Sequence, residues 1–541
     1  MIFDRPAEVA GLAKTGAERV IGNAQAAAVL RVFRVDRQRP PRHRDNQRNA
    51  GGRPEKRAVE YLDKLAQESA GDVELQRELA AAYDKIGRIQ GNSYFSNLGD
   101  TDGAMKSAFR ALEIRERLAA ADPKNLELQR ELAESLRSAG DMRYTVDDLP
   151  ATRQFYERGL RILQKISAAA PENKSFRYDL AEMHARLGDV TGMEGYPNLG
   201  DTLGALENYR QATAINEELL SSEPENKSYQ LNLARRYANL GMMQNTVGDS
   251  AAAIETGLKS VALQEKLVAE DSNNTDKKIN LLSALIALRY PLLDEGRAEE
   301  AIANGRRVIK TINEMLAADP KNAQFRRSLG VSYNSLGICL RESGDTGGAI
   351  ENHEQALKIA EALYAETPNG ENASDISITR MFLAEAQILA RNYEAALKNL
   401  RQTAGEYEKK IAAGSTNKRV KDDLSTAYAG IAQSLAALGD LQNGIDYHRR
   451  ALKLAEEVAA ESPFNARIQS RLGQRYYDLG EALLRAAPEP ENCLEARQNF
   501  EKSSSVWQKL HERQALRGSF LKNLENIPQK ISGCERKDRP I

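Results

Sequence analysis

Residues 319–349 read DPKNAQFRRSLGVSYNSLGICLRESGDTGGA, and this stretch contains the pattern that decides the fold. A proline turn opens it, a segment with Tyr333 and Gly337 follows, and Ala349 comes after a second turn. The same order of residues recurs about every 48 residues, from residue 70 to about residue 515. Self-similarity at a fixed period of this length indicates a solenoid, in which each unit buries its apolar face against its neighbours. Such a chain is expected to hold another molecule rather than to transform it.

The turns between units mark the repeat most clearly. Six of the eight contain a proline, which ends a helix because it has no N–H group to donate and restricts the residue before it. The turns are Asp122-Pro123, Ala170-Pro171, Glu223-Pro224, Asp271-Ser272, Asp319-Pro320, Thr367-Pro368, Ser415-Thr416 and Ser462-Pro463. We therefore expect nine units, which start near residues 70, 123, 171, 224, 272, 320, 368, 416 and 463.

Small, aromatic and alanine positions form three columns within the units. The small column contains Gly87, Gly140, Gly188, Gly241, Gly337, Ala384, Ala432 and Gly480, and its one exception is Arg289. Four residues earlier stands an aromatic column of Tyr83, Tyr237, Tyr333, Tyr428 and Tyr476. About twelve residues later stands a column of Ala104, Ala205, Ala253, Ala301, Ala349, Ala396 and Ala496. Small residues let two helices approach and the tyrosine fills the gap between pairs, so we predict these columns as core.

An aromatic residue, then Leu-Gly, then Ala resembles the tetratricopeptide repeat in order and spacing. The resemblance implies an all-α fold, a right-handed α-α superhelix of about nine helix pairs, longer than usual because the unit exceeds 34 residues. The stretches VEYLDKLAQESAGDVELQRELAAAY (59–83) and GNSYFSNLGDTDGAM (91–105) are similar to the array that follows the catalytic domain in certain large bacterial serine/threonine protein kinases. That narrower resemblance implies a bacterial cytoplasmic interaction module, with a kinase domain encoded upstream as one expected partner.

Kinase catalytic motifs are missing from the sequence. It contains no glycine-rich phosphate loop, no Val-Ala-Ile-Lys strand and no Asp-Phe-Gly. The triplet His43-Arg44-Asp45 is the only partial match to a kinase catalytic loop in the sequence, but Ala50 stands where such a loop needs asparagine. We therefore predict neither an enzyme nor a nucleotide or other cofactor site.

Charge is distributed unevenly along the chain. The formal net charge of the 541 residues is −1. Residues 1–57 hold 13 Lys and Arg against 6 Asp and Glu, so the remainder is mildly acidic. An acidic array is a poor surface for nucleic acid, because the phosphate backbone demands concentrated positive charge.

The sequence also argues against metal, disulfide and membrane roles. Cys339, Cys493 and Cys534 are scattered and odd in number, which excludes a zinc spacing or disulfide framework and suits a reducing cytoplasm. The longest apolar run, LLSALIAL (281–288), is far shorter than the roughly 20 residues that a membrane span requires.

Both ends of the chain depart from the repeat. Residues 31–57 contain nine arginines with Pro and Gly between them, and residues 1–57 are expected to be disordered. This leader is either a basic arm for an acidic partner or, as we favour, a frameshifted or mis-started segment. The repeat array is expected to cover 58–515. Residues 516–541 are weak in pattern and are expected to be a C-terminal tail whose last residues are loose.

The concave face of a tetratricopeptide array is lined mainly by the first helix of each pair. On this resemblance we predict Arg235, Asn245, Tyr290, Asn334 and Arg341 as peptide-binding residues. Ile286, Tyr290 and Leu293 would form an apolar strip with basic edges, which suits a peptide with acidic residues. They would equally pack inside the array, because Arg289 and Pro291 disturb this unit. Tyr94-Phe95 and Tyr196 are the next candidates for a binding surface.

Two functions follow from these patterns. The first is a non-catalytic scaffold that binds peptide segments of other proteins. The alternative is a regulatory fragment of a bacterial serine/threonine kinase that has lost its catalytic domain.

Overall fold

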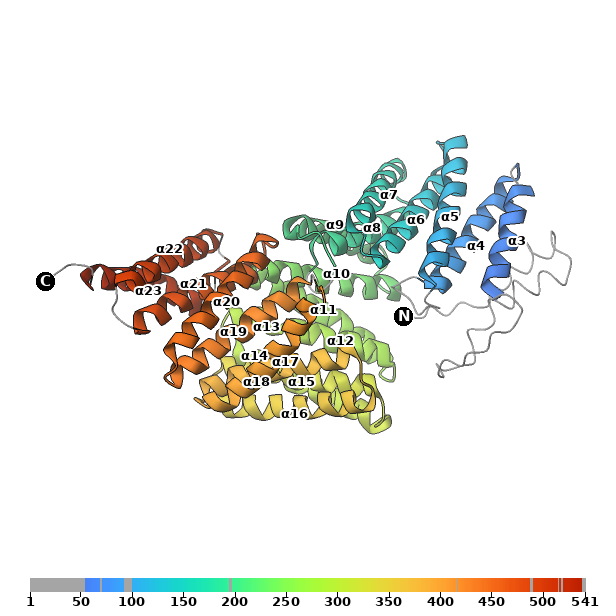
Figure 1. Cartoon of the computed structure of the whole chain (residues 1–541). Helices are drawn as coiled ribbons and strands as arrows, with labels where there is room; N and C mark the ends of the chain where they lie inside the picture. The colour runs from blue at the N-terminus through green and yellow to red at the C-terminus, as the bar shows by residue number, and fades with distance from the viewer. Residues whose placement is uncertain are drawn as a thin grey trace. The chain divides into compact units, whose positions relative to one another are not determined.

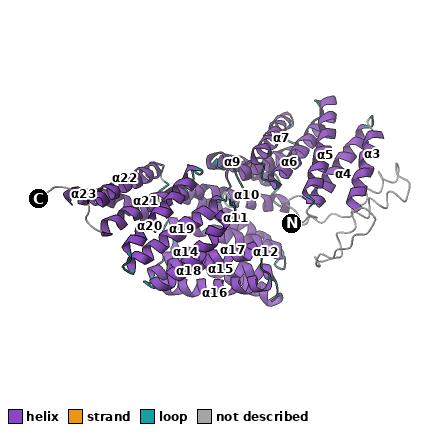
Figure 2. Ribbon diagram, in the orientation of Figure 1, coloured by secondary structure: helices purple, strands orange, loops and turns teal. Residues whose placement is uncertain are grey.

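The computed structural model describes residues 54–68, 71–91, 100–193, 197–415, 417–486, 490–513, 515–516 and 519–537. The regular elements within these ranges are all α-helices, and none is a strand (Figure 2). The expectation of an all-α helical repeat is confirmed. Residues 1–53 of the predicted leader, Tyr94-Phe95 and Tyr196 lie outside the described residues. Two compact units make up the chain, residues 1–190 and 191–541.

The described part of unit 1 begins with one helix and continues with helix pairs (Figure 1). Its helices are α3 (Pro54–Glu68), α4 (Val73–Gly91), α5 (Thr101–Ala121), α6 (Leu126–Thr145), α7 (Leu149–Ala169) and α8 (Lys174–Gly192), whose last residues extend past 190.

Unit 2 contains the longer run of helices. They are α9 (Thr202–Ser222), α10 (Lys227–Thr246), α11 (Ser250–Glu270), α12 (Thr275–Ala287), α13 (Arg289–Asp294), α14 (Ala298–Ala318), α15 (Ala323–Glu342), α16 (Thr346–Glu366), α17 (Gly370–Leu389), α18 (Tyr393–Ala412), α19 (Lys418–Ala437), α20 (Leu441–Ala460), α21 (Ala466–Ala486), α22 (Pro490–Glu512) and α23 (Ser519–Lys537). Between α3 and α23 the described helices follow one another as nine pairs, and the first helix of the fifth pair is divided into α12 and α13.

Side-chain caps set where most helices begin. The first helix of a pair is usually capped by asparagine: the Asn322 side chain accepts a hydrogen bond from the Phe325 N–H (3.1 Å). The second helix is usually capped by aspartate: the Asp345 side chain accepts from the Gly348 N–H (2.8 Å). Such caps satisfy N–H groups that have no partner in the first turn of a helix.

A left-handed residue ends the first helix of several pairs. Gly344 has φ of 91°, directly before the Asp345 cap. A glycine adopts this conformation without steric penalty and so stops the helix. Asp147 and Arg391, each with φ of 61°, occupy the matching position in two other pairs.

In several pairs a ring from the second helix packs on the small position, and at Gly87 and Gly241 the second helix itself approaches closely. A Cβ on Gly337 would lie 2.6 Å from Cε1 of His353, and one on Gly140 would lie 2.4 Å from Cε1 of Tyr156. Of the ten residues predicted as core, eight are buried: Tyr83, Gly87, Gly241, Gly337, Ala349, Tyr428, Tyr476 and Gly480. Tyr237 and Tyr333 are only partly buried.

Four tyrosines of the aromatic column share a further contact. Each hydroxyl donates to a carboxylate 20 residues earlier in the chain, on the preceding helix. The pairs are Tyr83–Asp63 (2.6 Å), Tyr237–Glu217 (2.7 Å), Tyr428–Glu408 (2.5 Å) and Tyr476–Glu456 (2.6 Å). Tyr333 differs, because residue 313 is an asparagine.

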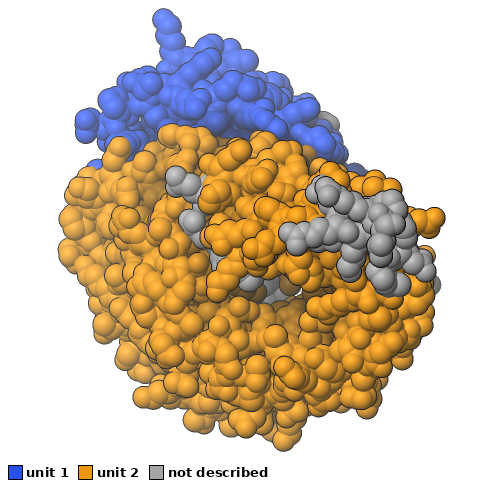
Figure 3. Space-filling model, turned by 90° about the vertical axis from the view of Figure 1, so that its left-hand side faces the viewer, with its two compact units in different colours: residues 1–190 blue, residues 191–541 orange. Residues whose placement is uncertain are grey.

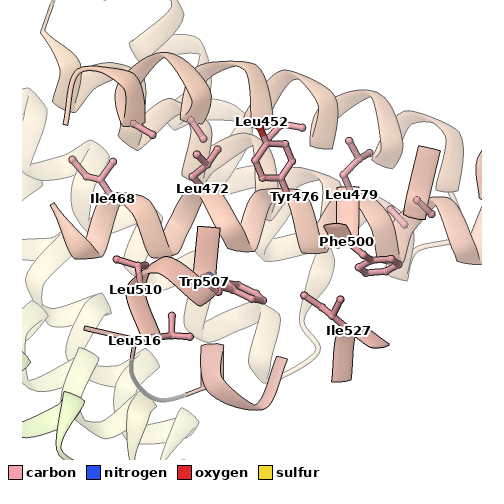
Figure 4. Packing of buried hydrophobic residues seen from close by; sticks show 14 of the residues in the cluster. Leu452, Ile468, Leu472, Tyr476, Leu479, Phe500, Trp507, Leu510, Leu516 and Ile527 are labelled. Carbon is pink, nitrogen blue, oxygen red and sulfur yellow. The ribbon is translucent and has the colours of Figure 1, made fainter. Parts of the chain in front are cut away.

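Residues 519–537 of the expected C-terminal tail form a helix, α23. Helix α23 packs on the last helix pair, and Ile527 is buried in the same cluster as Leu472 and Trp507 (Figure 4). The Trp507 ring is fully buried, and its Nε1–H donates to the Ser470 carbonyl (3.0 Å). The final pair would otherwise expose an apolar face, and α23 covers it as a terminal cap.

The last helices of unit 2 return to its first helices. The turn at Gly248, between α10 and α11, lies against Ala515 at the end of the last pair, since a Cβ on Gly248 would be 2.5 Å from the Ala515 Cβ. Gly200, just before α9, lies against the Glu461 carbonyl at the end of α20. Unit 2 therefore closes on itself within one superhelical turn.

Candidate binding site in the interior of unit 2

Unit 2 is hollowed near its centre (Figure 3). Side chains that are distant in sequence meet inside it. The guanidinium carbon of Arg467, on α21, lies 3.7 Å from the centroid of the Tyr290 ring, on α13. The first helices of the fifth and ninth pairs thus face each other across the interior, and Tyr290 is the predicted site residue placed at their meeting point.

A local break in the repeat places Tyr290 there. Arg289 stands in the small column, and Pro291 follows two residues later; helix α12 ends at Ala287 and α13 starts at Arg289. Proline removes one helical hydrogen bond and clashes with the preceding turn, so the helix is interrupted at this point. On the facing helix, glycine replaces the ring found in other pairs: Gly305 and Arg289 line the same small gap.

Two guanidinium groups enclose the Tyr290 ring. The Arg289 carbon lies 4.0 Å from the ring centroid, close to the distance for Arg467. Cations over an aromatic face are attracted by its quadrupole, more strongly where water is excluded. Burial acts to raise the pKa of the Tyr290 phenol, but Arg289, Arg467 and Arg471 together outweigh it and lower that pKa. The phenol therefore lies in a positive electrostatic potential. We call Arg289, Tyr290 and Arg467 the arginine–tyrosine clamp.

Ion pairs surround the clamp. Arg341 on α15 pairs with Glu385 on α17, and Arg471 on α21 pairs with Asp422 on α19 (2.5 Å). These pairs join successive first helices across the interior wall. They hold the wall together and neutralise most of its charge.

Arg475, one turn beyond Arg471 on α21, is nearly fully buried. It lies 3.7 Å from the Asp478 carboxylate, and its Nη2 donates to the Thr426 hydroxyl (3.1 Å). Burial lowers the pKa of this guanidinium, because the charged form is poorly solvated there. Its charge is thus paired with that of Asp478.

The clamp arginines have no such partners. Among the described residues, neither Arg289 nor Arg467 has a carboxylate oxygen within 4.0 Å, and the Nε of Arg289 is buried without a hydrogen-bond partner. With the neighbouring arginines each paired, two positive charges remain uncompensated beside the Tyr290 ring. Such a concentration of positive charge in a partly enclosed site favours an anionic ligand.

The other predicted site residues lie in different surroundings. Asn334 is buried: its amide nitrogen donates to the Thr379 hydroxyl (2.7 Å), and its oxygen lies 3.0 Å from His353 Nδ1. Asn334 therefore belongs to the packing of the sixth and seventh pairs rather than to a ligand site. Arg341 lines the interior, but its guanidinium is paired with the Glu385 carboxylate.

Arg235 and Asn245, both on α10, are partly buried. The Asn245 side-chain oxygen accepts a hydrogen bond from the Ser250 hydroxyl (3.4 Å) across the turn to α11. Neither residue is part of the clamp, which is built from α13 and α21. The five predicted residues thus do not form one site.

Of the two alternatives for the apolar residues of the fifth pair, the structure favours packing for Ile286 and Leu293. Ile286 and Leu293 pack against the hydrophobic cluster of the fifth pair, because they lie on the sides of α12 and α13 that face α14 and α15. Tyr290, between them in sequence, faces the interior with charged neighbours instead. The interior wall at this level is thus charged rather than apolar.

Sequence reasoning missed Arg467, Arg471, Glu385 and Asp422. A signal for Arg471 and Asp422 exists in the spacing, because opposite charges recur one repeat apart. Arg130–Asp179, Arg327–Asp375 and Asp422–Arg471 are separated by 48 or 49 residues, and each pair is an ion pair in the structure. Arg467 is different: 48 or 49 residues before it stand Arg419 and Lys418, which are also basic.

In unit 1, the buried charged side chains are paired with one another or with polar groups. Arg115 is 5% exposed, and its Nη1 donates to the Asp84 carboxylate (2.8 Å) and to the Ser135 hydroxyl (3.0 Å). Burial raises the pKa of Asp84 to about 6, against the opposing effect of Arg115. Asp141, 1% exposed, accepts a hydrogen bond from Tyr156 (2.6 Å). These groups form hydrogen bonds and ion pairs with one another, which indicates a structural role rather than ligand binding.

Other kinds of site lack support in the described ranges. These ranges contain no group of three His, Cys, Asp or Glu side chains arranged to hold a metal ion. Burial raises the pKa of the Cys339 thiol to about 11, which disfavours the reactive thiolate. None of the helices described has the length and apolar character to cross a membrane.

Comparison with known proteins gives similarity of fold alone. No family model matches the sequence, and no curated protein matches it. The fold is similar to the apo form of RapI, with a TM-score of 0.47 and 11% identity, over 77% of this chain and 98% of that chain. It is also similar to yeast Tom70, with a TM-score of 0.34 and 14% identity over 89% and 96% of the chains. A tetratricopeptide repeat protein from Parabacteroides merdae gives a TM-score of 0.33 and 12% identity over 66% and 98%.

Proposed function

We propose that the chain is a non-catalytic scaffold whose unit 2 binds peptide segments of other proteins, and that acidic residues of the segment contact the arginine–tyrosine clamp. The observation that carries this proposal is the Tyr290 ring between Arg289 and Arg467, neither of which has a carboxylate partner among the described residues.

The arrangement suits recognition because each part is held in place. Arg289 and Tyr290 are positioned by the interrupted helix, and Arg467 extends from α21, whose neighbouring arginine is tied to Asp422. Stacking on the ring fixes each guanidinium plane and leaves its N–H groups at the edge free to donate. A ligand carboxylate would then meet pre-oriented donors, which lowers the entropy cost of binding.

Peptide recognition by charged side chains on a rigid helical wall depends on a few anchoring contacts. The proposal places the activity in a bacterial cytoplasm, on the resemblance of the repeats to kinase-linked arrays. Origin as a regulatory kinase fragment stays a prediction, because it rests on residues 59–105 alone.

Display of a random peptide library on the full chain tests the proposal. We expect enriched peptides to contain acidic residues and to lose binding when Arg289 and Arg467 are both replaced by Gln. Arg307→Gln and Arg449→Gln are matched controls, because these arginines lie on the second helices of the fifth and eighth pairs and already pair with Glu265 and Glu495. Enrichment of peptides that bind the double variant as tightly as the parent would contradict the proposed site.

A further inference from the structure

We propose that the arginine–tyrosine clamp is a site for a phosphate monoester, such as a phosphorylated serine or threonine in the bound segment. This inference rests on the proposed function and specifies which anionic group the site prefers.

The charge of the site is the first argument. Arg341, Arg471 and Arg475 are compensated by Glu385, Asp422 and Asp478, in that order. Arg289 and Arg467 remain, so two positive charges are uncompensated at the clamp among the described side chains. A carboxylate brings one negative charge and would leave one guanidinium unpaired in a partly buried position, which is costly. A phosphate monoester carries about −1.5 to −2 charges at pH 7 and matches the site.

The geometry is the second argument. The guanidinium carbons lie 4.0 and 3.7 Å from the ring centroid, and they belong to helices α13 and α21 on facing walls. A flat carboxylate has two oxygens and can face one guanidinium fork well. A tetrahedral phosphate has three free oxygens and can accept from donors that approach from separate directions, as arginine clusters require.

The Tyr290 hydroxyl supplies a third donor. It has no hydrogen-bond partner among the described residues, although the hydroxyls of Tyr83, Tyr428 and Tyr476 each donate to a carboxylate. Burial acts to raise the Tyr290 pKa, but the neighbouring arginines outweigh this effect and lower that pKa. The phenol therefore lies where negative charge is stabilised. Its O–H is therefore available to an anion between the two arginines.

Glu385 acts on the Tyr290 phenol against the arginines, although it is paired with Arg341. The arginines outweigh it, so the potential at the clamp stays positive. In a positive potential the attraction grows with the negative charge of the ligand, which favours a dianion over a carboxylate.

Calorimetric titration of the full chain in a low-salt buffer without phosphate tests the inference in two arms. The first arm uses inorganic phosphate and O-phosphoserine against acetate and glutamate. The second uses peptides recovered by display, resynthesised with serine, glutamate or phosphoserine at the acidic position. We expect phosphoserine to bind at least about tenfold more tightly than glutamate in both arms, as a bond between charged groups worth about 1.4 kcal/mol would give.

Variants assign the binding to the clamp. Tyr290→Phe keeps the ring and removes the hydroxyl, and should weaken phosphoserine binding several-fold or more. Arg467→Gln should abolish the preference for phosphoserine over glutamate, and Arg467→Lys, which keeps the charge but loses the fork, should restore part of it. Circular dichroism and thermal melting check that each variant stays folded, and Arg449→Gln should titrate like the parent.

The two proposals fail in different ways. If display recovers no peptide, the peptide-binding function fails, and the first arm still decides the phosphate site. If peptides bind and glutamate equals phosphoserine in affinity, the scaffold stands and the phosphate inference is overturned. Binding of phosphoserine that Arg467→Gln leaves unchanged would also overturn it, because the anion would then lie elsewhere.

Discussion

The fifth and sixth helix pairs follow the same repeat but use it in opposite ways. In the sixth pair, Gly337 on α15 makes room for the buried ring of His353 on α16. In the fifth pair the sizes are exchanged: Arg289 takes the small position and Gly305 takes the place of the ring. The regular pair uses its column for packing alone. The irregular pair keeps its apolar contacts and gains a cationic group beside Tyr290, so a single departure from the repeat creates the candidate site.

The largest difference between the two pairs is expected at the position four residues before the small column. Leu285 in the fifth pair is 3% exposed, whereas Tyr333 in the sixth is only partly buried. Leu285→Ala should lower the free energy of unfolding by about 2–5 kcal/mol, as buried leucine truncations do. Tyr333→Ala should cost less, about 1–2 kcal/mol. Urea denaturation of both variants measures the difference, and a larger loss for Tyr333 would reverse the packing assignment.

The next largest effect on stability is expected for substitutions in the small column and in the ring position that faces it. A Cβ on Gly337 would lie 2.6 Å from the His353 ring, whereas one on Gly305 would meet the end of the Leu336 side chain at 3.3 Å. Gly337→Ala should destabilise by about 1–3 kcal/mol through overpacking, and Gly337→Leu by at least as much. Gly305→Ala should change stability by less than about 0.5 kcal/mol, because a flexible side chain can yield and alanine favours the helix.

Gly405 provides the control for this comparison. It lies inside α18, and a Cβ added there would meet nothing within 4 Å, so Gly405→Ala should stabilise by about 0.5–1 kcal/mol. If thermal melts show Gly337→Ala and Gly405→Ala shifting stability in the same direction, steric contact with His353 is not what requires glycine at residue 337.

The sixth pair should also respond to pH where the fifth does not. Burial, with Arg341 adding to it, lowers the pKa of His353 to about 3 from an ordinary 6.5. The unfolded state therefore binds more protons than the folded state between these values, so stability falls as pH is lowered through this window. The loss from His353 is at most about 1.4 kcal/mol per pH unit.

His353→Gln should remove that contribution. Its free energy of unfolding, measured in urea at pH 7, 6 and 5, should fall less steeply than that of the parent. Gly305→Ala, in the pair without the histidine, should keep the parent's slope. An unchanged slope in His353→Gln would show that folding does not lower the pKa of the histidine.

The smallest effect on stability is expected at Arg289, where the fifth pair departs from the repeat. Arg289 forms no ion pair with the described carboxylates, and Gly305 leaves space beside it. Arg289→Gln should therefore change the free energy of unfolding by less than about 0.5 kcal/mol while weakening capture of acidic peptides. A loss of several kcal/mol in chemical denaturation would make Arg289 a structural residue.

Much of the fold follows from local pattern in the sequence. Prolines at the turns end helices, and the recurring Gly and Ala positions mark where helices approach, so the units and their all-α character can be predicted. The ring that packs on some of the small positions was harder to predict, because it is His353 in one pair, Tyr156 in another and Phe500 in a third. Helix α23 was missed because its apolar residues match no column and only the last pair gives them a surface.

The candidate site could be predicted only in part. Tyr290 was predicted from its position on the first helix of its pair, whereas Arg289 and Pro291 beside it favoured packing inside the array. Arg467 lies 177 residues later, and nothing local to either residue indicates that unit 2 closes and brings them together. Asn334 was assigned to the binding face by helical position, but its short side chain reaches Thr379 on the neighbouring helix instead.

The central claim is that an anionic segment binds where Arg467 meets Tyr290. The most direct measurement is the Kd of one display-selected acidic peptide for Arg467→Gln and for Arg449→Gln, by calorimetry on folded full-length protein. Both variants lose one positive charge, but only Arg467 contacts Tyr290. We predict that Arg467→Gln weakens binding at least about tenfold while Arg449→Gln binds like the parent. Equal Kd values for the two variants would contradict the claim.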